Sequence, residues 1–400
     1  MGGSGLELCP SASDQAFRLA AEKIFKEPGL KKIVFIITDC DFGGAEQMLY
    51  ELCRGLAGKF SVQVLTLKSK GHFAKLIEES GVPVKSFGLG PKIGAGYFAQ
   101  LSGVFFKIRH ELKTHNPDLV QGVLFQGNLL AKLAGRAAGC KLILCSLHTF
   151  ERGALKQIAE KLTHSLADRY IVVSEALKKF CAEKFSIPES EIVVIRNGIA
   201  SSQREARKIS PAELGVKTSG ALLGAIGRLH REKGIDLLLR AFARLCPELP
   251  GLGLVVIGDG PERDNLAGLA EQLGIRERVL FSGFLPEPER FLPLFSVFVL
   301  PSRIEAMPVA LMQAMAAGRA IVATRVGAVA ELIDDEKSGL LVPAEDDSRL
   351  AQAIRRILRE PALAARLGAE AKSKAEREFS LDKMLASYEQ LYTSLLEGQG

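Results

Sequence analysis

Two polar side chains interrupt an apolar segment, SRIEAMPVALMQAMAAGRAIVAT, at residues 302–324. The segment predicts a strand end, a short loop with the carboxylate of Glu305, and a helix with Pro308 in its first turn. Gln313 follows on that helix. Because helix-start amides favour anionic oxygens, we expect an anionic ligand at this helix start, close to Glu305 and Gln313. The structural alternative is a core helix in which both polar residues are incidental.

Two cations lie in the sequence GRLHREKGIDLLL, between a predicted strand and a predicted helix. They are Arg228 and Lys233. Two fixed cations beside free helix-start amides can neutralise a departing diphosphate. Exposed basic residues in a loop are often only solvated, but this arrangement favours phosphate binding.

A glycine pair, Gly43 and Gly44, ends a predicted strand and opens a helix in ITDCDFGGAEQML. Paired glycines let the backbone approach a ligand closely. Asp39 and Asp41 in the same turn raise the alternative of a Mg²⁺ site beside a diphosphate. We expect no metal site, because fixed cations in the second half of the chain make a metal redundant.

Two further strand ends carry candidate residues. His148 follows the apolar run LILCSL, and Phe284 and Leu285 follow VLFSG. A histidine at a strand end can face a ligand, although a structural role is the alternative. The loop with Phe284 and Leu285 would offer backbone groups to the edge of a nucleobase.

The chain alternates continuous apolar strands with amphipathic helices, which is typical of α/β folds with parallel sheets covered on both faces. The pattern lapses near residue 200 and then restarts. We therefore expect a leader at 1–28 with a short helix at 14–25, a doubly wound Rossmann-like domain at 29–200, and a second Rossmann-like domain at 201–378. A helix at 379–400 should pack on the first domain. Ligands of such sheets bind beyond the carboxyl ends of the strands, so we expect the site in a cleft between the two domains.

Composition excludes several classes of protein. With 400 residues and 47% hydrophobic residues, the chain is long enough for two cores and is not disordered. It has no run long enough to span a bilayer and no signal-peptide pattern, so we expect a cytoplasmic protein. Its 7 cysteines form no CxxC pair, which argues against disulfides and structural zinc.

Positive charge is concentrated in the first half of the chain, and residues 51–150 hold 13 Lys and Arg against 5 Asp and Glu. Part of this excess lies on a predicted helix near residues 97–113. The helix places apolar residues at helical spacing beside basic ones: Phe98, Leu101, Phe105, Ile108 and Leu112 beside Lys107, Arg109 and Lys113. We expect a core-facing helix with a solvated basic face; the alternative is a contact with anionic lipid or an anionic acceptor. Aromatic and basic residues do not interleave, which argues against nucleic-acid binding.

The ordered motifs resemble one family. They are GGAE, SLHTF, VVSEALKKF, IRNGI, GRLHREKG, VIGDGPER, FSGFL, PSRIEAMPVALMQAMAAG and ELIDDEKSGLLV, spread over residues 31–393. This set is similar to that of the retaining glycosyltransferases of family 4. The resemblance implies the two-domain GT-B fold, with 29–200 as the acceptor-side domain and 201–378 as the nucleotide-sugar-binding domain. It also implies transfer of a sugar from a nucleotide diphosphate donor with retained configuration and no required metal.

The resemblance also implies roles for particular residues. Gly43 and Gly44 would lie against the donor's sugar and diphosphate, and His148 would contact the sugar. Arg228 and Lys233 would bind the diphosphate, and Glu305 the sugar hydroxyls near the reacting carbon. The helix-start backbone would face sugar and phosphate through these residues: Met307, Pro308, Val309 and Ala310.

The sequence departs from the family pattern at two positions. Gln313 stands where the family has a second Glu that grips the ribose. An amide is a weaker partner than a carboxylate, so donor affinity is expected to fall by about 1–2 kcal/mol. Ala200 replaces the usual Asp after Asn-Gly, which puts the interdomain contact made there in doubt.

We expect an enzyme that uses a nucleotide sugar, with UDP preferred, to extend a glycolipid or polysaccharide precursor of the cell envelope. It would work at the inner face of the membrane. A catalytically silent GT-B protein that binds a nucleotide sugar or scaffolds a complex is the alternative. A nucleotide-sugar epimerase of the same fold is a third reading. A Rossmann dehydrogenase lacks support, because no GxGxxG follows the first strand of either domain.

Overall fold

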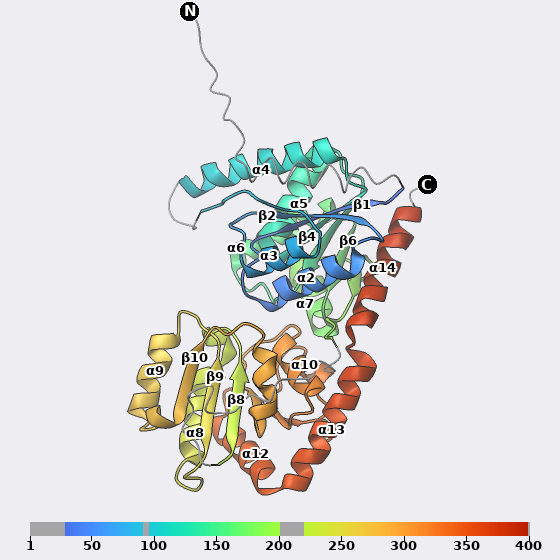
Figure 1. Ribbon diagram of the computed structural model, residues 1–400. Helices are drawn as coiled ribbons and strands as arrows, with labels where there is room; N and C mark the ends of the chain where they lie inside the picture. The colour runs from blue at the N-terminus through green and yellow to red at the C-terminus, as the bar shows by residue number, and fades with distance from the viewer. Residues whose placement is uncertain (1–28, 91–95, 201–219, 399–400) are drawn as a thin grey trace, which may run out of the picture. The chain divides into compact units, whose positions relative to one another are not determined.

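Continuous Val, Ile and Leu runs form two parallel sheets in the computed structural model (Figure 1). The structure describes residues 29–90, 96–200 and 220–398. The expected leader at 1–28 with its short helix, and residues 201–219 of the stretch where the strand pattern lapses, lie outside these residues. The chain divides into two units. Unit 1 comprises residues up to 172, 180–193 and from 388 onward, and unit 2 comprises 173–179 and 194–387.

Unit 1 contains a seven-stranded sheet in the order β3-β2-β1-β4-β5-β6-β7. Each strand pair with a defined register is parallel. The strands β4 and β5 are buried along their whole length and β1 at every residue after Lys32, as expected for a sheet covered on both faces. The strands are β1 (Lys32–Ile37), β2 (Ser61–Thr66), β3 (Val84–Ser86), β4 (Leu119–Val123), β5 (Ile143–Leu147), β6 (Arg169–Val172) and β7 (Ile192–Val194).

The helices of unit 1 lie on both faces of this sheet. They are α2 (Gly44–Leu56), α3 (His72–Glu79), α4 (Gly96–His115), α5 (Leu124–Ala138), α6 (Ala154–Thr163) and α7 (Glu175–Phe185), the last of which begins in unit 2. The crossovers through α2 and α3 traverse the sheet in one direction, and those through α4, α5 and α6 in the other. Because such crossovers are right-handed, α2 and α3 cover one face and α4, α5 and α6 the opposite face.

Unit 2 contains a six-stranded parallel sheet in the order β10-β9-β8-β11-β12-β13. Its strands are β8 (Leu222–Ile226), β9 (Gly253–Ile257), β10 (Val279–Gly283), β11 (Val297–Leu300), β12 (Ile321–Thr324) and β13 (Leu340–Val342). Its helices are α8 (Ile235–Leu245), α9 (Arg263–Gln272), α10 (Val309–Ala316), α11 (Val329–Leu332), α12 (Asp347–Arg359) and α13 (Pro361–Glu378). The helix α14 (Leu381–Glu397) begins in unit 2, and its residues from 388 onward belong to unit 1.

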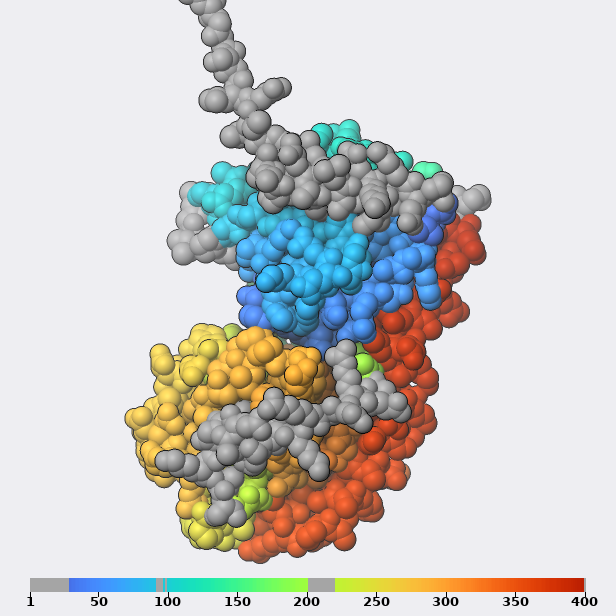
Figure 2. Space-filling model, in the orientation of Figure 1, coloured from blue at the N-terminus to red at the C-terminus, as the bar shows by residue number. Residues whose placement is uncertain are grey.

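Short 3-10 helices complete the two units: η1 (His164–Leu166), η2 (Glu189–Glu191), η4 (Arg231–Lys233), η5 (Arg276–Arg278) and η6 (Pro288–Leu294). Each unit has its own hydrophobic core, built from the inner faces of its sheet and helices. In the space-filling view, the first part of unit 1 is blue to cyan, much of unit 2 is yellow to orange, and the residues of the last helices are red (Figure 2). The α/β architecture predicted from the strand pattern is confirmed. No described helix has the length and apolarity to cross a bilayer.

Candidate functional site

The loops that follow β8, β9 and β10 meet at one edge of the unit 2 sheet. Leu229 N donates to Asp259 O at 2.8 Å, and Gly258 N donates to Gly283 O at 2.9 Å. A Cβ on Gly258 would lie 2.0 Å from Gly227 O, and its φ is 141°, so only glycine fits at this contact. Segments that are 25 to 31 residues apart are thus joined through their backbones.

Lys233 and Glu305 form an ion pair, with Nζ and Oε1 2.6 Å apart. Lys233 ends η4 after β8, and Glu305 lies in the loop after β11, the strand beside β8. Gly234 permits the approach, because its φ is 64° and a Cβ there would lie 2.1 Å from Pro301 O. The structure therefore brings together two of the residues that the sequence singled out.

Glu305 is held in place from several sides. Its carboxylate also accepts a hydrogen bond from Ser302 Oγ at 2.7 Å, and its side chain is only 6% exposed. Its backbone carbonyl accepts from Ala328 N at 3.0 Å. Thr324 Oγ1 donates to Ser302 O at 2.5 Å. Both side-chain contacts are made to Oε1, so Oε2 has no partner within the described residues and is available to a ligand.

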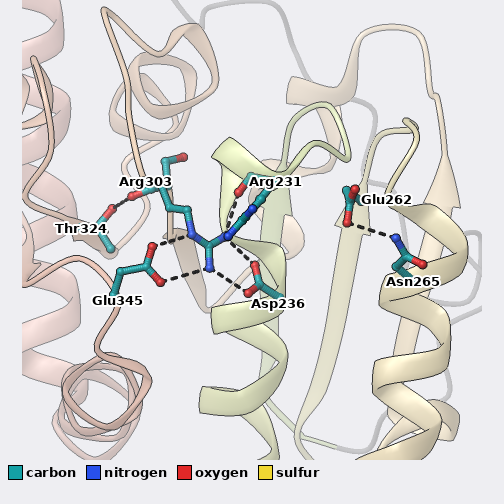
Figure 3. A network of polar contacts seen from close by, with 8 residues as sticks. Arg231, Asp236, Glu262, Asn265, Arg303, Thr324 and Glu345 are labelled. Carbon is teal, nitrogen blue, oxygen red and sulfur yellow. Dashed lines mark hydrogen bonds and ion pairs between the residues drawn. The ribbon is translucent and has the colours of Figure 1, made fainter. Parts of the chain in front are cut away.

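Arg303 connects the loop of Glu305 to the loop of Lys233, a role that sequence reasoning missed (Figure 3). Its guanidinium donates to both carboxylate oxygens of Asp236 at 2.7 and 2.8 Å and to Arg231 O at 2.8 Å. It also donates to Glu345 at 2.5 and 3.1 Å. These contacts hold the pKa of the Asp236 carboxyl below its usual range, despite the opposing effect of burial. The sequence offered only one signal for this role: Asp236 in GIDLL is close to Lys233, and Arg303 in SRIEA is close to Glu305.

Arg228 lies in the same loop as Lys233 but is exposed and makes no side-chain contact within the described residues. The helix α10 begins at Val309, and Pro308 is the residue before its first turn rather than in it. Met307 is fixed by Asn197 Nδ2, which donates to Met307 O at 3.2 Å. This contact accounts for the Asn of the RNGI motif, which sequence reasoning had not assigned to the site.

Gln313 lies half-buried on α10, where its Nε2 donates to Glu289 Oε2 at 3.4 Å. Glu289 comes from η6 and was not predicted as a site residue. No direct contact joins Gln313 to Glu305. Phe284 is 42% exposed beyond the end of β10, and Leu285 is half-buried beside it.

In unit 1, Gly43 and Gly44 open α2 directly after the β1 loop, and His148 follows β5. The strands β1 and β5 are both neighbours of β4, so these residues lie at the same carboxyl edge of the sheet. Gly43 has an extended backbone with φ 177°, and the Glu46 side chain lies against it. Backbone strain therefore does not require glycine at position 43.

His148 is supported by Ser146 and Asn128. Ser146 Oγ lies 3.0 Å from His148 Nε2, and Asn128 exchanges two hydrogen bonds with the Ser146 backbone at 3.0 and 3.1 Å. Burial lowers the pKa of His148 to about 4, so its ring is neutral at pH 7. Its Nδ1 is buried and has no partner in the described part of the chain. A neutral ring held in this way can exchange one hydrogen bond with a ligand hydroxyl.

The alternative of a Mg²⁺ site at Asp39 and Asp41 finds no third ligand in the described residues. Asp39 Oδ2 pairs with Lys68 Nζ at 2.8 Å. In the described ranges, no group of three or more His, Cys, Asp or Glu is arranged to hold a metal ion.

Two family descriptions match the chain in sequence. The one described as Glycosyltransferase Family 4 matches residues 42–203, and Glycosyl transferases group 1 matches residues 206–374. The chain belongs to glycosyltransferase family 4. The family predicted from the ordered motifs is therefore confirmed.

Curated family 4 relatives include proteins of lipopolysaccharide core biosynthesis. The glycosyltransferase LpsE of Rhizobium meliloti is 32% identical over 51% of the chain, and the mannosyltransferase LpcC of Rhizobium leguminosarum is 32% identical over 46%. The matched segments cover 58% and 55% of those proteins. The chain thus spans less than two thirds of the length of these curated relatives.

Solved structures show the fold of this family 4 chain. HepE of Anabaena, crystallised in complex with UDP-glucose, is 22% identical and superposes with a TM-score of 0.79. The match covers 91% of this chain and 99% of HepE. The two parallel sheets are therefore the two Rossmann-like halves of a GT-B fold, as predicted.

Proposed function

We propose that this protein is a retaining glycosyltransferase that moves a sugar from a nucleotide diphosphate sugar, with UDP preferred, to a glycolipid or polysaccharide-precursor acceptor. The observation that carries the proposal is the buried Glu305 carboxylate paired with Lys233 beside the exposed Arg228. These groups lie on loops at the carboxyl ends of parallel strands, where ligands of such sheets bind.

The charges suit the reaction. Breaking the anomeric bond leaves an electron-poor sugar and a departing diphosphate. The cations Arg228 and Lys233 stabilise that charge more in the transition state than in the ground state. Glu305 Oε2 accepts hydrogen bonds from sugar hydroxyls, while Oε1 keeps the Lys233 ammonium oriented. No protein nucleophile is required, because the acceptor attacks from the leaving-group face and a phosphate oxygen takes its proton.

The remaining predicted residues bind the donor. The backbone of Met307, Pro308, Val309 and Ala310 approaches sugar and phosphate, and Gln313 with Glu289 faces the ribose. Phe284 and Leu285 meet the nucleobase. In unit 1, Gly43 and Gly44 lie against the diphosphate, and His148 exchanges a hydrogen bond with a sugar hydroxyl. Neutral His148 suits this role because a charged ring would oppose the electron-poor sugar.

The acceptor and the place of action are inferred from the curated relatives and from α4. The names of LpsE and LpcC and the basic face of α4 favour a lipid-linked acceptor at the inner face of the cytoplasmic membrane. On α4, Ile108 and Leu112 are buried while Lys107 and Lys113 are exposed. Arg109 Nε donates to Ala137 O at 3.0 Å. Lys107 and Lys113 are therefore the stronger candidates for an anionic contact.

A catalytically silent nucleotide-sugar-binding protein is the second candidate, and Gln313 favours it. A donor screen separates the two. Purified protein is incubated with UDP-, GDP-, ADP- and dTDP-linked sugars in the presence of EDTA, and release of nucleotide diphosphate is followed. Membrane lipid extract is added in a parallel series to supply an acceptor.

We expect slow turnover of one donor that is lost in Glu305→Ala and Lys233→Ala. Arg231→Ala is the matched control, because this exposed cation lies two residues from Lys233 and its side chain lacks the Glu305 contact. Nucleotide binding without release in either series would support the silent protein. Turnover that is seen in a parallel reaction without EDTA, but not in its presence, would contradict a metal-independent mechanism.

A further inference from the structure

The helix α6 exposes the side of its surface that a helix normally buries. Its single buried residue is Glu160, which pairs with Lys132. Leu155, Ile158 and Leu162 are 83%, 54% and 77% exposed. A surface helix usually turns its apolar stripe toward the core and its charges toward water. In α6 this arrangement is inverted.

The inversion has a visible cause. Glu160 is only 1% exposed, and Lys132 and Tyr170 lie beside it in the interior of unit 1. A buried carboxylate needs such a partner, so the charge pair fixes the rotation of α6. Leu155, Ile158 and Leu162 lie on the side of the helix opposite Glu160. With Glu160 turned inward, these three side chains must face outward.

Two further exposed apolar side chains lie on helices that cover the same face of the sheet as α6. Seven large apolar side chains are strongly exposed in the described residues, and five of them lie on α4, α5 and α6. The other two of these five are Phe106 on α4 and Leu133 on α5. The helices α4, α5 and α6 cover the same face of the unit 1 sheet, and α5 packs against both of the others. Exposed apolar residues gathered on one face mark an interaction surface.

The charge of this face favours anionic lipid. Residues 96–166 contain nine Lys and Arg against four Asp and Glu. Within α6, all of which the structure describes, Lys161 is exposed and the only acid is the buried Glu160. Arg152 is exposed just before the helix. Of the nearby acids, Glu151 is paired with Lys156 and Glu111 with Lys85. A helix surface of aliphatic and basic side chains without an exposed carboxylate suits the headgroup region of an anionic bilayer.

We propose that α6 is a membrane-contact helix, with Leu155, Ile158 and Leu162 inserted at the lipid interface and Arg152 and Lys161 near anionic headgroups. This inference deepens the proposed function, since it names the surface that brings the enzyme to a lipid-linked acceptor. It differs from a contact through the basic face of α4 alone. Basic side chains attract anionic lipid without entering the bilayer, whereas the apolar side chains of α6 would insert into it. Its test does not depend on enzyme activity.

The absence of tryptophan from the chain permits a direct experiment. Ile158→Trp places a single tryptophan reporter on the exposed stripe. Its emission is recorded with vesicles of phosphatidylcholine alone, with vesicles that also contain phosphatidylglycerol, and with brominated lipid as quencher. We expect a blue shift and quenching that require phosphatidylglycerol. Tyr50→Trp on α2, on the opposite face of the same sheet, is the matched control and should show neither change.

The contribution of the stripe is measured by vesicle sedimentation. The triple variant Leu155→Ser, Ile158→Ser and Leu162→Ser should bind anionic vesicles at least about tenfold more weakly than the wild type. Its donor turnover in solution and its thermal unfolding should be unchanged, because the three side chains are exposed and lie outside the proposed donor site. Loss of turnover by Lys233→Ala with unchanged vesicle binding would separate the two proposals.

Two outcomes would overturn the membrane proposal. Vesicle binding that is equal in the wild type and the triple variant would assign the contact to other residues. A wild type that ignores vesicles but forms dimers in sedimentation velocity, with dimers lost in the triple variant, would show that a second copy covers α6.

Discussion

Glu289 lies beside Gln313, and this contact changes what a substitution at residue 313 is expected to do. From the sequence alone, Gln313→Glu should tighten donor binding by restoring a carboxylate for the ribose. In the structure, a carboxylate already lies 3.4 Å from the Gln313 amide. A second one at 313 would face it at close range, and like charges disfavour each other's ionised form.

We therefore predict that Gln313→Glu weakens nucleotide binding by about tenfold, which corresponds to about 1.4 kcal/mol. The double variant Gln313→Glu with Glu289→Gln exchanges the two groups and should recover most of the lost affinity. Calorimetric titration with UDP measures all three proteins. Tighter binding by the single variant would show that Glu289 does not share the pocket of the ribose.

His148 supplies a prediction for pH. In the unfolded chain it takes up a proton near pH 6.5, whereas burial lowers its pKa to about 4 in the folded protein. Between these values the unfolded state binds more protons, so the free energy of unfolding contributed by His148 rises with pH across this window. The contribution is lost as pH falls toward 4 and amounts to about 3 kcal/mol at most.

We expect denaturant unfolding at pH 4.5 and pH 7 to show a smaller pH effect for His148→Gln than for the wild type. His110→Gln is the control, because His110 is exposed on α4. An identical pH effect in the wild type and His148→Gln would mean that the ring is solvated and titrates normally.

At the scale of elements, the site depends on how η4 and the loop after β11 are fastened to each other. Arg303 is only 18% exposed and uses its planar fork on Asp236, while its backbone N donates to Glu232 O at 2.8 Å. We regard Arg303 as a positioning residue that acts through the Lys233 and Glu305 pair. A lysine has one charged centre and cannot replace that fork.

Arg303→Lys is predicted to lower kcat/KM for the donor by at least about tenfold, because small displacements of aligned groups are costly. Arg325→Lys is the matched control, since its pairing with Asp335 is exposed and lies outside the two loops. If Arg303 acts through Lys233, its substitution should have little further effect in Lys233→Ala. Additive effects of the two substitutions would show that Arg303 acts independently of that pair.

At the scale of the molecule, the two units do not consist of two continuous halves of the chain. The end of α14 completes the core of unit 1, where Tyr388 and Tyr392 are buried. Tyr392 Oη donates to Gln121 Oε1 on β4 at 2.6 Å, and its ring meets Phe60 edge to face. The part of α14 from residue 388 onward therefore packs within unit 1.

Tyr392→Phe removes one hydroxyl and leaves the buried Gln121 oxygen without that donor, so we predict a loss of about 1–3 kcal/mol in unfolding free energy. Lys59→Gln removes an exposed ion pair with Glu389 and should cost less than about 1 kcal/mol. Hydrogen exchange should locate the Tyr392→Phe effect in β1 and β4, with β8 and β9 still protected. Equal loss of protection in both sheets would show that the two units unfold as one.

The α/β architecture was readable from the sequence because it follows local rules. Buried parallel strands need continuous Val, Ile and Leu, and the Gly-rich loops that follow them recur at the strand ends. The types of residue at the site were also visible, because Arg228, Lys233 and Glu305 each follow a predicted strand. Family membership followed from the order of these motifs.

Tertiary structure alone decided which of these residues meet. Lys233 and Glu305 are 72 residues apart, Asp236 and Arg303 are 67 apart, and Glu289 reaches Gln313 across 24. No local periodicity encodes such pairs, because they depend on which strands become neighbours and on how loops pack. The same holds for α6, where the Lys132 and Glu160 pair sets the rotation of the helix. That rotation turns the apolar stripe toward solvent, although the helical spacing of its residues would assign it to the core.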